Sequence, residues 1–228
     1  MTEPTIERIP EEPDLPHPLG RAGVNHDPKS RNFAFVAPDP RPIVDVAWHR
    51  RVPVYDQGII GSCTAHALCG ALSTLPHRHH FRSERNIVKF YRAATAIDPW
   101  PGQYPPEDTG SDGLSVAKVA LAKGWITRYE HIFTWNDFLQ AMMVGPVIVG
   151  TEWREQMFWP DPFGGVRPIG SVAGGHEYQA FGIDVARRRV WFFNSWGPGW
   201  GVEGRFFMTW DDFRSLLAAD GDATVLVP

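Results

Sequence analysis

A cysteine at the start of a predicted helix is the first residue that could do chemistry. In the stretch VYDQGIIGSCTAHALCGAL, residues 54–72, Ser62 is a suitable helix cap and Cys63 falls in the first helical turn. The free amide groups and the dipole at that helix end favour the thiolate, which is the reactive form of cysteine. Because small cysteines are also common core residues, position alone leaves both interpretations of Cys63 open. Cys69, deeper in the same helix, is expected to be a core residue.

A thiolate needs a base, and His176 is the histidine with the best-defined context. It lies in AGGHEYQAFGID, a predicted strand entered through two small residues, although a lone strand histidine is more often structural. Asn194 follows in VWFFNSWGPGWG, at the end of the next strand, where it could orient the imidazole ring. Asparagine at a turn is also common for its own reasons. The histidines of PHRHH lack a matching set of metal ligands, and we expect a solvated loop there.

The composition indicates an ordinary globular protein with a sizeable core. The 228 residues are 43% apolar and 13% aromatic, and the formal charge of -4 comes from 22 basic and 26 acidic residues mixed along the chain. This charge pattern gives no reason to expect nucleic acid as a partner. The glycine-rich GPGWGVEG precedes a predicted strand and not a helix, which argues against a nucleotide-binding loop, so we expect neither a cofactor nor a metal.

The sequence shows no targeting or membrane segment. No run approaches the ~18 apolar residues of a membrane span, and residues 1–20 lack the layout of a signal peptide. We therefore expect a soluble protein without a membrane partner, either cytoplasmic or associated with a virion. The two cysteines face different sides of one predicted helix and cannot pair with each other, which fits a reducing compartment.

Residues 1–42 form a proline-rich extension, termed the arm. Its prolines exclude a long inhibitory helix, which leaves an extended strand on the surface or in a groove of its own body, or a tether to a larger assembly. The segment RNFAFVAP carries Phe33, Phe35 and Val36 in near alternation. We expect this segment to dock on the body and residues 1–20 to remain loose.

The folded body is predicted to span residues 43–228 and to have two lobes. Apolar residues at three- and four-residue steps predict helices over about 58–145, one of them starting at the cap Ser115. Short β-type runs separated by Gly, Pro and Asp turns predict a mainly antiparallel sheet over about 146–228. Helices followed by strands indicate an α+β fold, and the seam between two packed lobes is a usual place for a site.

Taken together, these residues resemble the papain-like (C1) cysteine peptidases from about Ile43 to the end, especially the disulfide-poor forms of bacteria and phages. The resemblance rests on three motifs in the family's order: a glutamine with a cysteine six positions later, then GGH, then NSWGPGWG. It implies an α+β fold with a helical lobe, an antiparallel β-barrel-like lobe and the active-site cleft between them. It also implies a cysteine endopeptidase that hydrolyses a peptide or protein substrate through a Cys-His-Asn triad and an acyl-enzyme.

The resemblance assigns roles to the matching residues. Cys63 would be the nucleophile, His176 the base and later the acid, and Asn194 the residue that orients the imidazole. Gln57 would supply an oxyanion donor together with the Cys63 backbone amide. Four further residues would border the bound substrate, the last of them also covering the His-Asn contact: Gly113, Gly175, Glu177 and Trp196.

The sequence departs from the family pattern at several positions. Ile60 stands where many secreted relatives have a disulfide cysteine, Thr64 replaces an aromatic residue, and GSDGLS lacks the usual double glycine. Glu177 stands where relatives usually carry alanine. Strand alternation aims it away from the side that His176 faces. In the relatives that the chain resembles, this position borders the pocket for the second residue before the cut, where a carboxylate would favour Arg or Lys. An outward-facing or hydrogen-bonded glutamate is the other interpretation.

Two other functions remain open. The same Cys-His pair serves amidases that cut cell-wall peptides and enzymes that transfer acyl groups. The fold could also be a catalytically silent scaffold, such as a component of a phage particle. The joint presence of the four matched catalytic residues weighs against a scaffold, because binding alone has no physical need for all of them.

Overall fold

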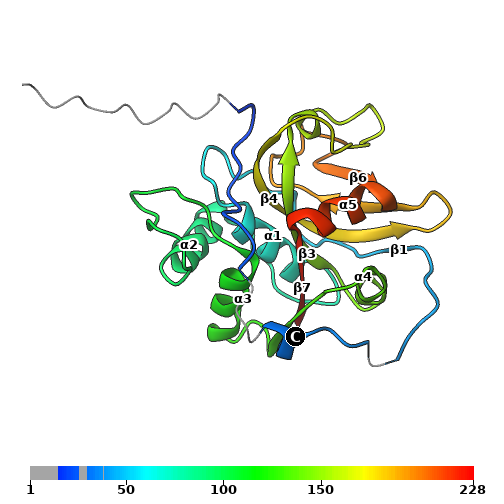
Figure 1. Cartoon of the computed structure of the whole chain (residues 1–228). Coiled ribbons are helices and arrows are strands. Elements are labelled where there is room, and N and C mark those ends of the chain that lie inside the picture. The colour runs from blue at the N-terminus through cyan, green and yellow to red at the C-terminus, as the bar shows by residue number, and fades with distance from the viewer. Residues whose placement is uncertain (1–14, 26–29, 38) are drawn as a thin grey trace, which may run out of the picture.

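The computed structural model describes residues 15–25, 30–37 and 39–228 and arranges them as two packed lobes (Figure 1). Three helices form the first lobe: α1 Cys63–Leu72, α2 Glu84–Thr95 and α3 Gly113–Ala122. The second lobe is built on a β-sheet against which two further helices pack: α4 Trp135–Met142 and α5 Trp210–Asp220. Two short 3-10 helices complete the helical elements of the described residues: η1 Ser30–Phe33 and η2 Glu155–Phe158.

The described part of the chain contains one antiparallel sheet of seven strands in the order β2-β7-β3-β4-β5-β6, with β1 paired to β4. The strands are β1 Val46–Ala47, β2 Arg128–His131, β3 Val147–Arg154, β4 Val172–Asp184, β5 Arg189–Phe193, β6 Arg205–Thr209 and β7 Asp222–Val227. His176 lies near the start of β4, and Asn194 directly follows β5. Because β4 and β5 are antiparallel neighbours, these two residues lie at the same end of the sheet.

Each lobe has its own apolar core. Leu68, Phe90 and Val116 join α1, α2 and α3 in the helical lobe. Trp153 and Phe192, fully buried on the two strands that flank β4, anchor the larger core of the second lobe. The predicted α+β architecture of two lobes is therefore confirmed, and it creates a seam along which residues from both lobes meet.

The structure corrects one local expectation from the sequence and adds one helix. The helix predicted to start at the cap Ser115 begins at Gly113, because the Asp112 carboxylate accepts from the Ser115 amide at 2.7 Å and caps the helix three residues before Ser115. Helix α5 was not predicted, since Phe213 and Leu216 are its only fully buried residues and leave a short apolar stripe.

The arm contacts the body in two separate places. Of the three apolar side chains expected to dock RNFAFVAP, residues 31–38, Phe35 is buried in the core of the sheet lobe, whereas Phe33 is 43% and Val36 76% exposed. The docking of the described part of this segment therefore depends on Phe35. Residues 15–20, expected to be loose, instead lie against the body. The remainder of the segment expected to be loose, residues 1–14, is outside the described residues.

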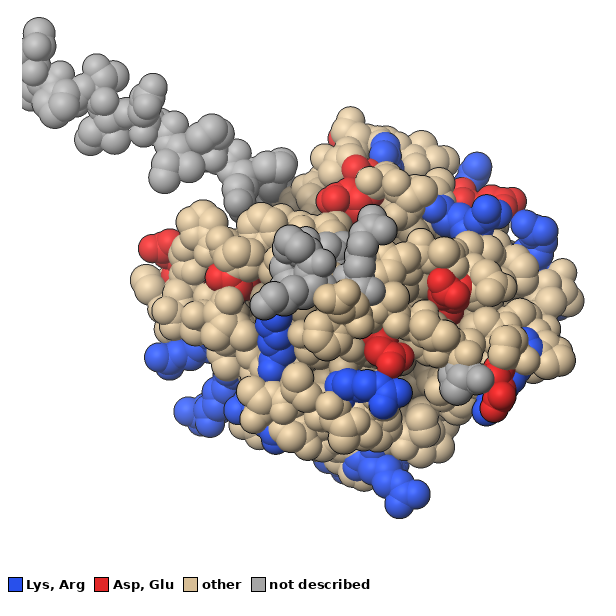
Figure 2. All heavy atoms as spheres, turned by 60° about the horizontal axis from the view of Figure 1, so that its bottom comes forward, with Lys and Arg blue, Asp and Glu red and all other residues tan. Residues whose placement is uncertain are grey.

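Acidic and basic side chains of the described residues are interspersed on the face seen in Figure 2. Among the helices that the structure describes, none combines the length and the apolar character needed to cross a membrane.

Candidate active site

Cys63 is the first residue of α1, as expected, and it has no exposed surface. Ser62 occupies the N-cap position, but its hydroxyl makes no capping hydrogen bond and instead contacts His66 Nδ1 at 3.2 Å. The backbone amide of Glu177, in β4, donates to Cys63 Sγ at 3.4 Å. The thiol therefore lies at the seam, between a helix N-terminus of one lobe and a strand of the other. Cys69 is buried in the core of the helical lobe, as predicted.

His176 and Asn194 are joined by a hydrogen bond of 2.7 Å between Nε2 and Oδ1. The Ser195 amide also donates to Asn194 Oδ1 at 2.8 Å, which identifies this atom as the carbonyl oxygen of the side chain. Nε2 must then carry the ring proton, because it donates to that oxygen. Nδ1 is left as the unprotonated nitrogen, and it is buried without a hydrogen-bond partner in the described structure.

Aromatic rings enclose this histidine. The ring of Trp196 stacks on His176 with centroids 4.6 Å apart, and Trp153 meets His176 edge-on at 4.9 Å. Trp200 in turn meets Trp196 edge-on at 5.0 Å. Because the rings exclude water, the hydrogen bond between His176 and Asn194 lies in a medium of low dielectric constant, where it is stronger.

Gln57 is held with its amide nitrogen toward the arm. Its Oε1 accepts from the Ser195 hydroxyl at 2.7 Å, and its Nε2 donates to the Ile60 carbonyl at 2.8 Å. The same Nε2 also lies 3.4 Å from the carbonyl oxygen of Pro18, in the arm. The side chain predicted to be an oxyanion donor is therefore oriented by its neighbours and already contacts a carbonyl.

Burial shifts both titratable groups toward their neutral forms. It raises the pKa of the Cys63 thiol to about 12 and lowers the pKa of His176 to about 3, because each charged form would lose water. The hydrogen bonds from the Glu177 amide and to Asn194 oppose these shifts but are weaker. The described state thus pairs a neutral thiol with a neutral imidazole, and not the thiolate that a helix N-terminus alone favours.

Residues 15–25 of the arm run through the seam as an irregular segment with a single bridge between Arg21 and Ser111, and in Figure 1 this blue segment descends between the helical lobe and the sheet. The amides of Gly20 and Arg21 donate to the Gly175 carbonyl at 3.3 and 3.0 Å. On the opposite side the Ser111 amide donates to Gly20 O at 3.0 Å, and the Ser111 carbonyl accepts from the residue after Arg21 at 2.8 Å. Backbone of both lobes therefore binds the arm as it would bind an extended peptide.

The arm also covers the residues around the thiol. His17 stacks on Trp196 with centroids 4.6 Å apart, and Trp196 Nε1 donates to the Pro18 carbonyl at 3.2 Å. Gly20 comes so close to the loop before α1 that a Cβ on it would lie 1.9 Å from a backbone oxygen. The arm thus adds to the cover over the residues around Cys63, which itself has no exposed surface.

The four residues predicted to border a substrate all lie along the seam. Gly175 and Trp196 contact the arm directly, whereas the backbone pairing near Gly113 is made by Ser111, two residues earlier. Glu177 is fully buried, and its carboxylate oxygens have no hydrogen-bond partner among the described residues. Neither an outward-facing nor a hydrogen-bonded glutamate fits this environment.

Two features of the site were missed in the sequence. Arg21 lies in the seam with its guanidinium against the Asp222 carboxylate, and Ser111 supplies the backbone that pairs with the arm. The sequence signal for Arg21 was that it is an isolated basic residue in the acidic, proline-rich start of the chain. No motif marks Asp222, because it reaches the site only through the pairing of β7 with β3.

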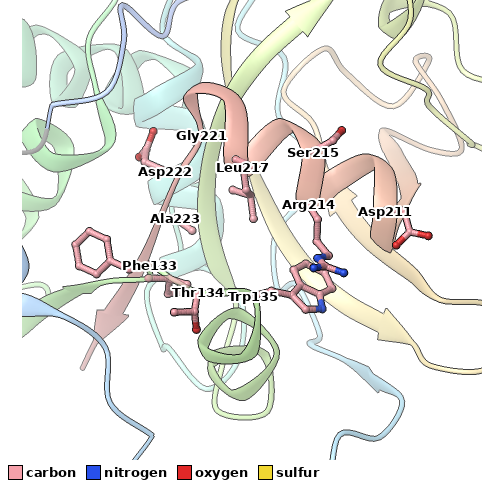
Figure 3. Close-up of a pocket in the computed structure, with 12 residues that line it drawn as sticks. Phe133, Thr134, Trp135, Asp211, Arg214, Ser215, Leu217, Gly221, Asp222 and Ala223 are labelled. Atoms are coloured by element: carbon pink, nitrogen blue, oxygen red, sulfur yellow. The ribbon is translucent and has the colours of Figure 1, made fainter.

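A separate pocket of about 550 Å³ lies between the start of α4, α5 and the start of β7 (Figure 3). Trp135, Arg214 and Leu217 line it, together with Asp222 at its edge. Figure 3 shows that the Asp222 carboxylate points away from Trp135 and Arg214. A groove of about 800 Å³ follows the arm itself, between the loop before α1 and the start of β4.

Solved structures with a similar backbone are cysteine proteases. Xylellain, a cysteine protease from Xylella fastidiosa, aligns over 98% of this chain and 99% of its own with a TM-score of 0.73 and 20% identity. Procathepsin L 3 of the Tenebrio molitor larval midgut aligns over 88% and 75%, with a TM-score of 0.63 and 18% identity. Bromelain from Ananas comosus aligns over 77% and 93%, with a TM-score of 0.58 and 16% identity. The chain has the papain-like fold.

No protein-family model and no curated protein matches the sequence. Identities this low establish the papain-like fold and leave the activity to be argued from the residues in the seam. The papain-like fold predicted from three short motifs is confirmed by backbone similarity over nearly the whole chain.

Proposed function

We propose that the chain is a papain-like cysteine peptidase that hydrolyses peptide bonds, with Cys63 as nucleophile, His176 as base and Asn194 as the orienting residue. One observation carries the proposal. The His176 ring is tied through Nε2 to Asn194, its Nδ1 is unpartnered in the described structure, and the next residue of the same strand contacts Cys63 Sγ. The similarity of the backbone to cysteine proteases supports the same activity.

In the proposed first half-reaction, Nδ1 takes the proton of the Cys63 thiol as the sulfur attacks the substrate carbonyl carbon. The imidazolium then gives this proton to the leaving amine as the C–N bond breaks, which leaves a thioester between Cys63 and the acyl part. In the second half-reaction His176 takes a proton from water, and the hydroxide adds to the thioester. The C–S bond breaks, and the proton returns to the sulfur. Asn194 keeps Nδ1 as the basic nitrogen throughout.

The oxyanion formed in each half-reaction would be stabilised by Gln57 Nε2 and the Cys63 backbone amide. Two contacts support this role for Gln57. Ser195 fixes the orientation of the amide, and the arm carbonyl of Pro18 already lies 3.4 Å from Nε2. A substrate carbonyl that replaced the arm could take a similar position.

The decisive experiment combines turnover with labelling of the thiol. The full chain and its Arg21→Ala variant, in which the arm is less firmly held, are incubated with denatured casein and separately with a thiol-directed epoxide. We expect Cys63→Ala to abolish both peptide release and labelling, because the sulfur is lost. Undiminished peptide release by Cys63→Ala would reject the proposal.

Two further variants locate the chemistry. Gln57→Ala should lower the turnover rate by about 10²–10³-fold, the usual effect of losing one oxyanion donor. Cys69→Ala is the matched control, since this thiol is buried in the core of the helical lobe and should affect only stability. A loss below about tenfold in Gln57→Ala would remove Gln57 from the oxyanion hole.

A further inference from the structure

The guanidinium of Arg21 fills a closed acidic pocket beside the thiol. Its Nε and Nη2 donate to Asp222 Oδ1 at 2.9 and 2.7 Å, and Nη2 also donates to the backbone carbonyl of Asp220 at 2.8 Å. The Arg21 side chain is 1% exposed and that of Asp222 is 7% exposed. The ion pair is therefore buried, unlike the surface pairs of the described residues.

Two glycines, Gly150 and Gly113, leave the space for this guanidinium. A Cβ on Gly150, in β3, would lie 2.3 Å from Arg21 Nε and 2.8 Å from Asp222 Oδ1. A Cβ on Gly113 would lie 2.8 Å from an oxygen of Asp222 and 2.8 Å from an oxygen of Glu177. Any other residue at Gly150 would occupy the volume in which the long basic side chain lies. The pocket is thus shaped for an arginine as well as charged for one.

Glu177 gives the pocket a second carboxyl group. It is fully buried, and both of its oxygens lack a hydrogen-bond partner in the described structure. Burial raises the pKa of Glu177 well above its ordinary value, the nearby Asp222 raises it further, and Arg21 lowers it. If Arg21 leaves, Asp222 loses this buried partner, which is costly and favours the entry of another cation.

We propose that this pocket selects an arginine side chain of the substrate, and that Arg21 occupies it in the resting protein as an internal competitor. The proposal rests on the peptidase function proposed above. The backbone of Gly175, in β4, and of Ser111, just before α3, positions Arg21 between the two lobes. A substrate paired with the same backbone would place one side chain in the same pocket. The planar guanidinium of an arginine can donate to the Asp222 carboxylate and to the Asp220 carbonyl together, and a lysine ammonium fits these two acceptors less well. We therefore expect arginine to be preferred.

Peptide turnover tests the selectivity. The full chain with Arg21→Ala is assayed on fluorogenic peptides that are identical except for arginine, lysine or leucine at the second position before the cleaved bond. We expect kcat/KM for the arginine peptide to exceed that for the leucine peptide by about 30-fold or more, and Asp222→Asn to lower it by about 10², as for one lost partner of a buried charge pair. Asp211→Asn is the matched control, because Asp211 pairs with Arg188 on the surface.

A second measurement does not need turnover. Agmatine, a small guanidinium compound, is added to the full chain and to the Arg21→Ala variant while the unfolding temperature is followed. We expect agmatine to stabilise Arg21→Ala in a saturable manner, to have no such effect on the unchanged chain, and to lose its effect when Asp222→Asn is added. Arg21→Gln, which keeps most of the side-chain volume, replaces Arg21→Ala if the latter does not fold.

The two measurements separate the two proposals. Turnover without a preference for arginine would overturn the pocket proposal and leave the peptidase function intact. Stabilisation by agmatine without turnover of any peptide would reject the peptidase function and retain the pocket as a guanidinium site. The absence of both turnover and agmatine binding would overturn both.

Discussion

The two parts of the arm that the structure describes are held on the body by different forces. Residues 15–25 are bound mainly by backbone hydrogen bonds, one ring stack and the buried ion pair of Arg21, with Leu15 and Leu19 partly buried against the core of the sheet lobe. A bound substrate peptide could replace these contacts. Residues 30–37 are anchored by Phe35, which is part of the apolar core of the sheet lobe. The first part is bound as a ligand is bound, whereas the second is a piece of the fold.

This difference indicates what can move. The free energy gained by burying an aromatic side chain is lost when that side chain is exposed to water, so residues 30–37 should stay in place while the protein is folded. Polar contacts in the seam exchange for contacts with another peptide at a small net cost. The arm should therefore open at residues 15–25 and remain attached at residues 30–37.

The largest expected effect comes from reversing the charge of Arg21. In Arg21→Glu a third carboxyl group faces Asp222 and Glu177, which should expel residues 15–25 and admit water to Cys63. The pKa of the thiol should fall from about 12 toward its ordinary value of 9.0. Alkylation of Cys63 by iodoacetamide at pH 7 should then accelerate by about 10²–10³-fold, since each pKa unit changes the thiolate fraction tenfold. Peptide mapping by mass spectrometry measures it, and an unchanged rate would mean that the arm does not cover the thiol.

Phe35→Ala tests the other part of the arm. Removing a buried phenylalanine from a core should lower the free energy of unfolding by about 3–5 kcal/mol. The alkylation rate of Cys63 in the folded protein should change little. Urea unfolding measures the loss, with Val36→Ala as the exposed control, for which we expect a change within about 0.5 kcal/mol. A small effect of Phe35→Ala would contradict the distinction between the two parts.

Acid should lower the free energy of unfolding through His176. Its pKa is about 3 in the folded protein against an ordinary value of 6.5, so below pH 6.5 the unfolded chain binds a proton that the folded chain does not. Stability is therefore lost as the pH falls from 6.5 toward 3, and His176→Gln should remove about 2–3 kcal/mol of the loss between pH 6.5 and 4.5. Urea unfolding at several pH values measures it. His77→Gln is the control, because His77 is a second buried histidine whose pKa is about 4. If His176→Gln leaves the pH dependence of the unfolding free energy unchanged, the acid loss does not come from His176.

The smallest expected effect is that of His17→Ala. This change removes the stack on Trp196 but keeps the backbone contacts and Arg21 in place. The loss of one ring stack is worth about 1 kcal/mol, so Cys63 alkylation should rise by only about fivefold. The same alkylation assay measures it. A rise as large as that of Arg21→Glu would show that the ring stack, and not the ion pair, holds the arm in the seam.

The sequence by itself determined the fold class and the residues of the candidate triad. Local signals were sufficient for these, because a cap before an apolar helix, GGH at a strand start and NSWGPGWG at a strand end are each encoded within a few residues. The pairing of β4 with β5 then brings His176 and Asn194 to 2.7 Å, as the family resemblance implied. Their catalytic roles stay predictions until the variants are measured.

Only the tertiary structure decided the environment of these residues. The ordinary thiolate argument for Cys63 is a property of one helix end, whereas its raised pKa comes from the arm and the second lobe, which bury the sulfur. The same holds for the acidic pocket, in which Arg21 meets Asp222 across 201 positions of sequence. Burial and charge pairing depend on all groups within a few ångströms, and no local pattern in the sequence records which distant residues those are.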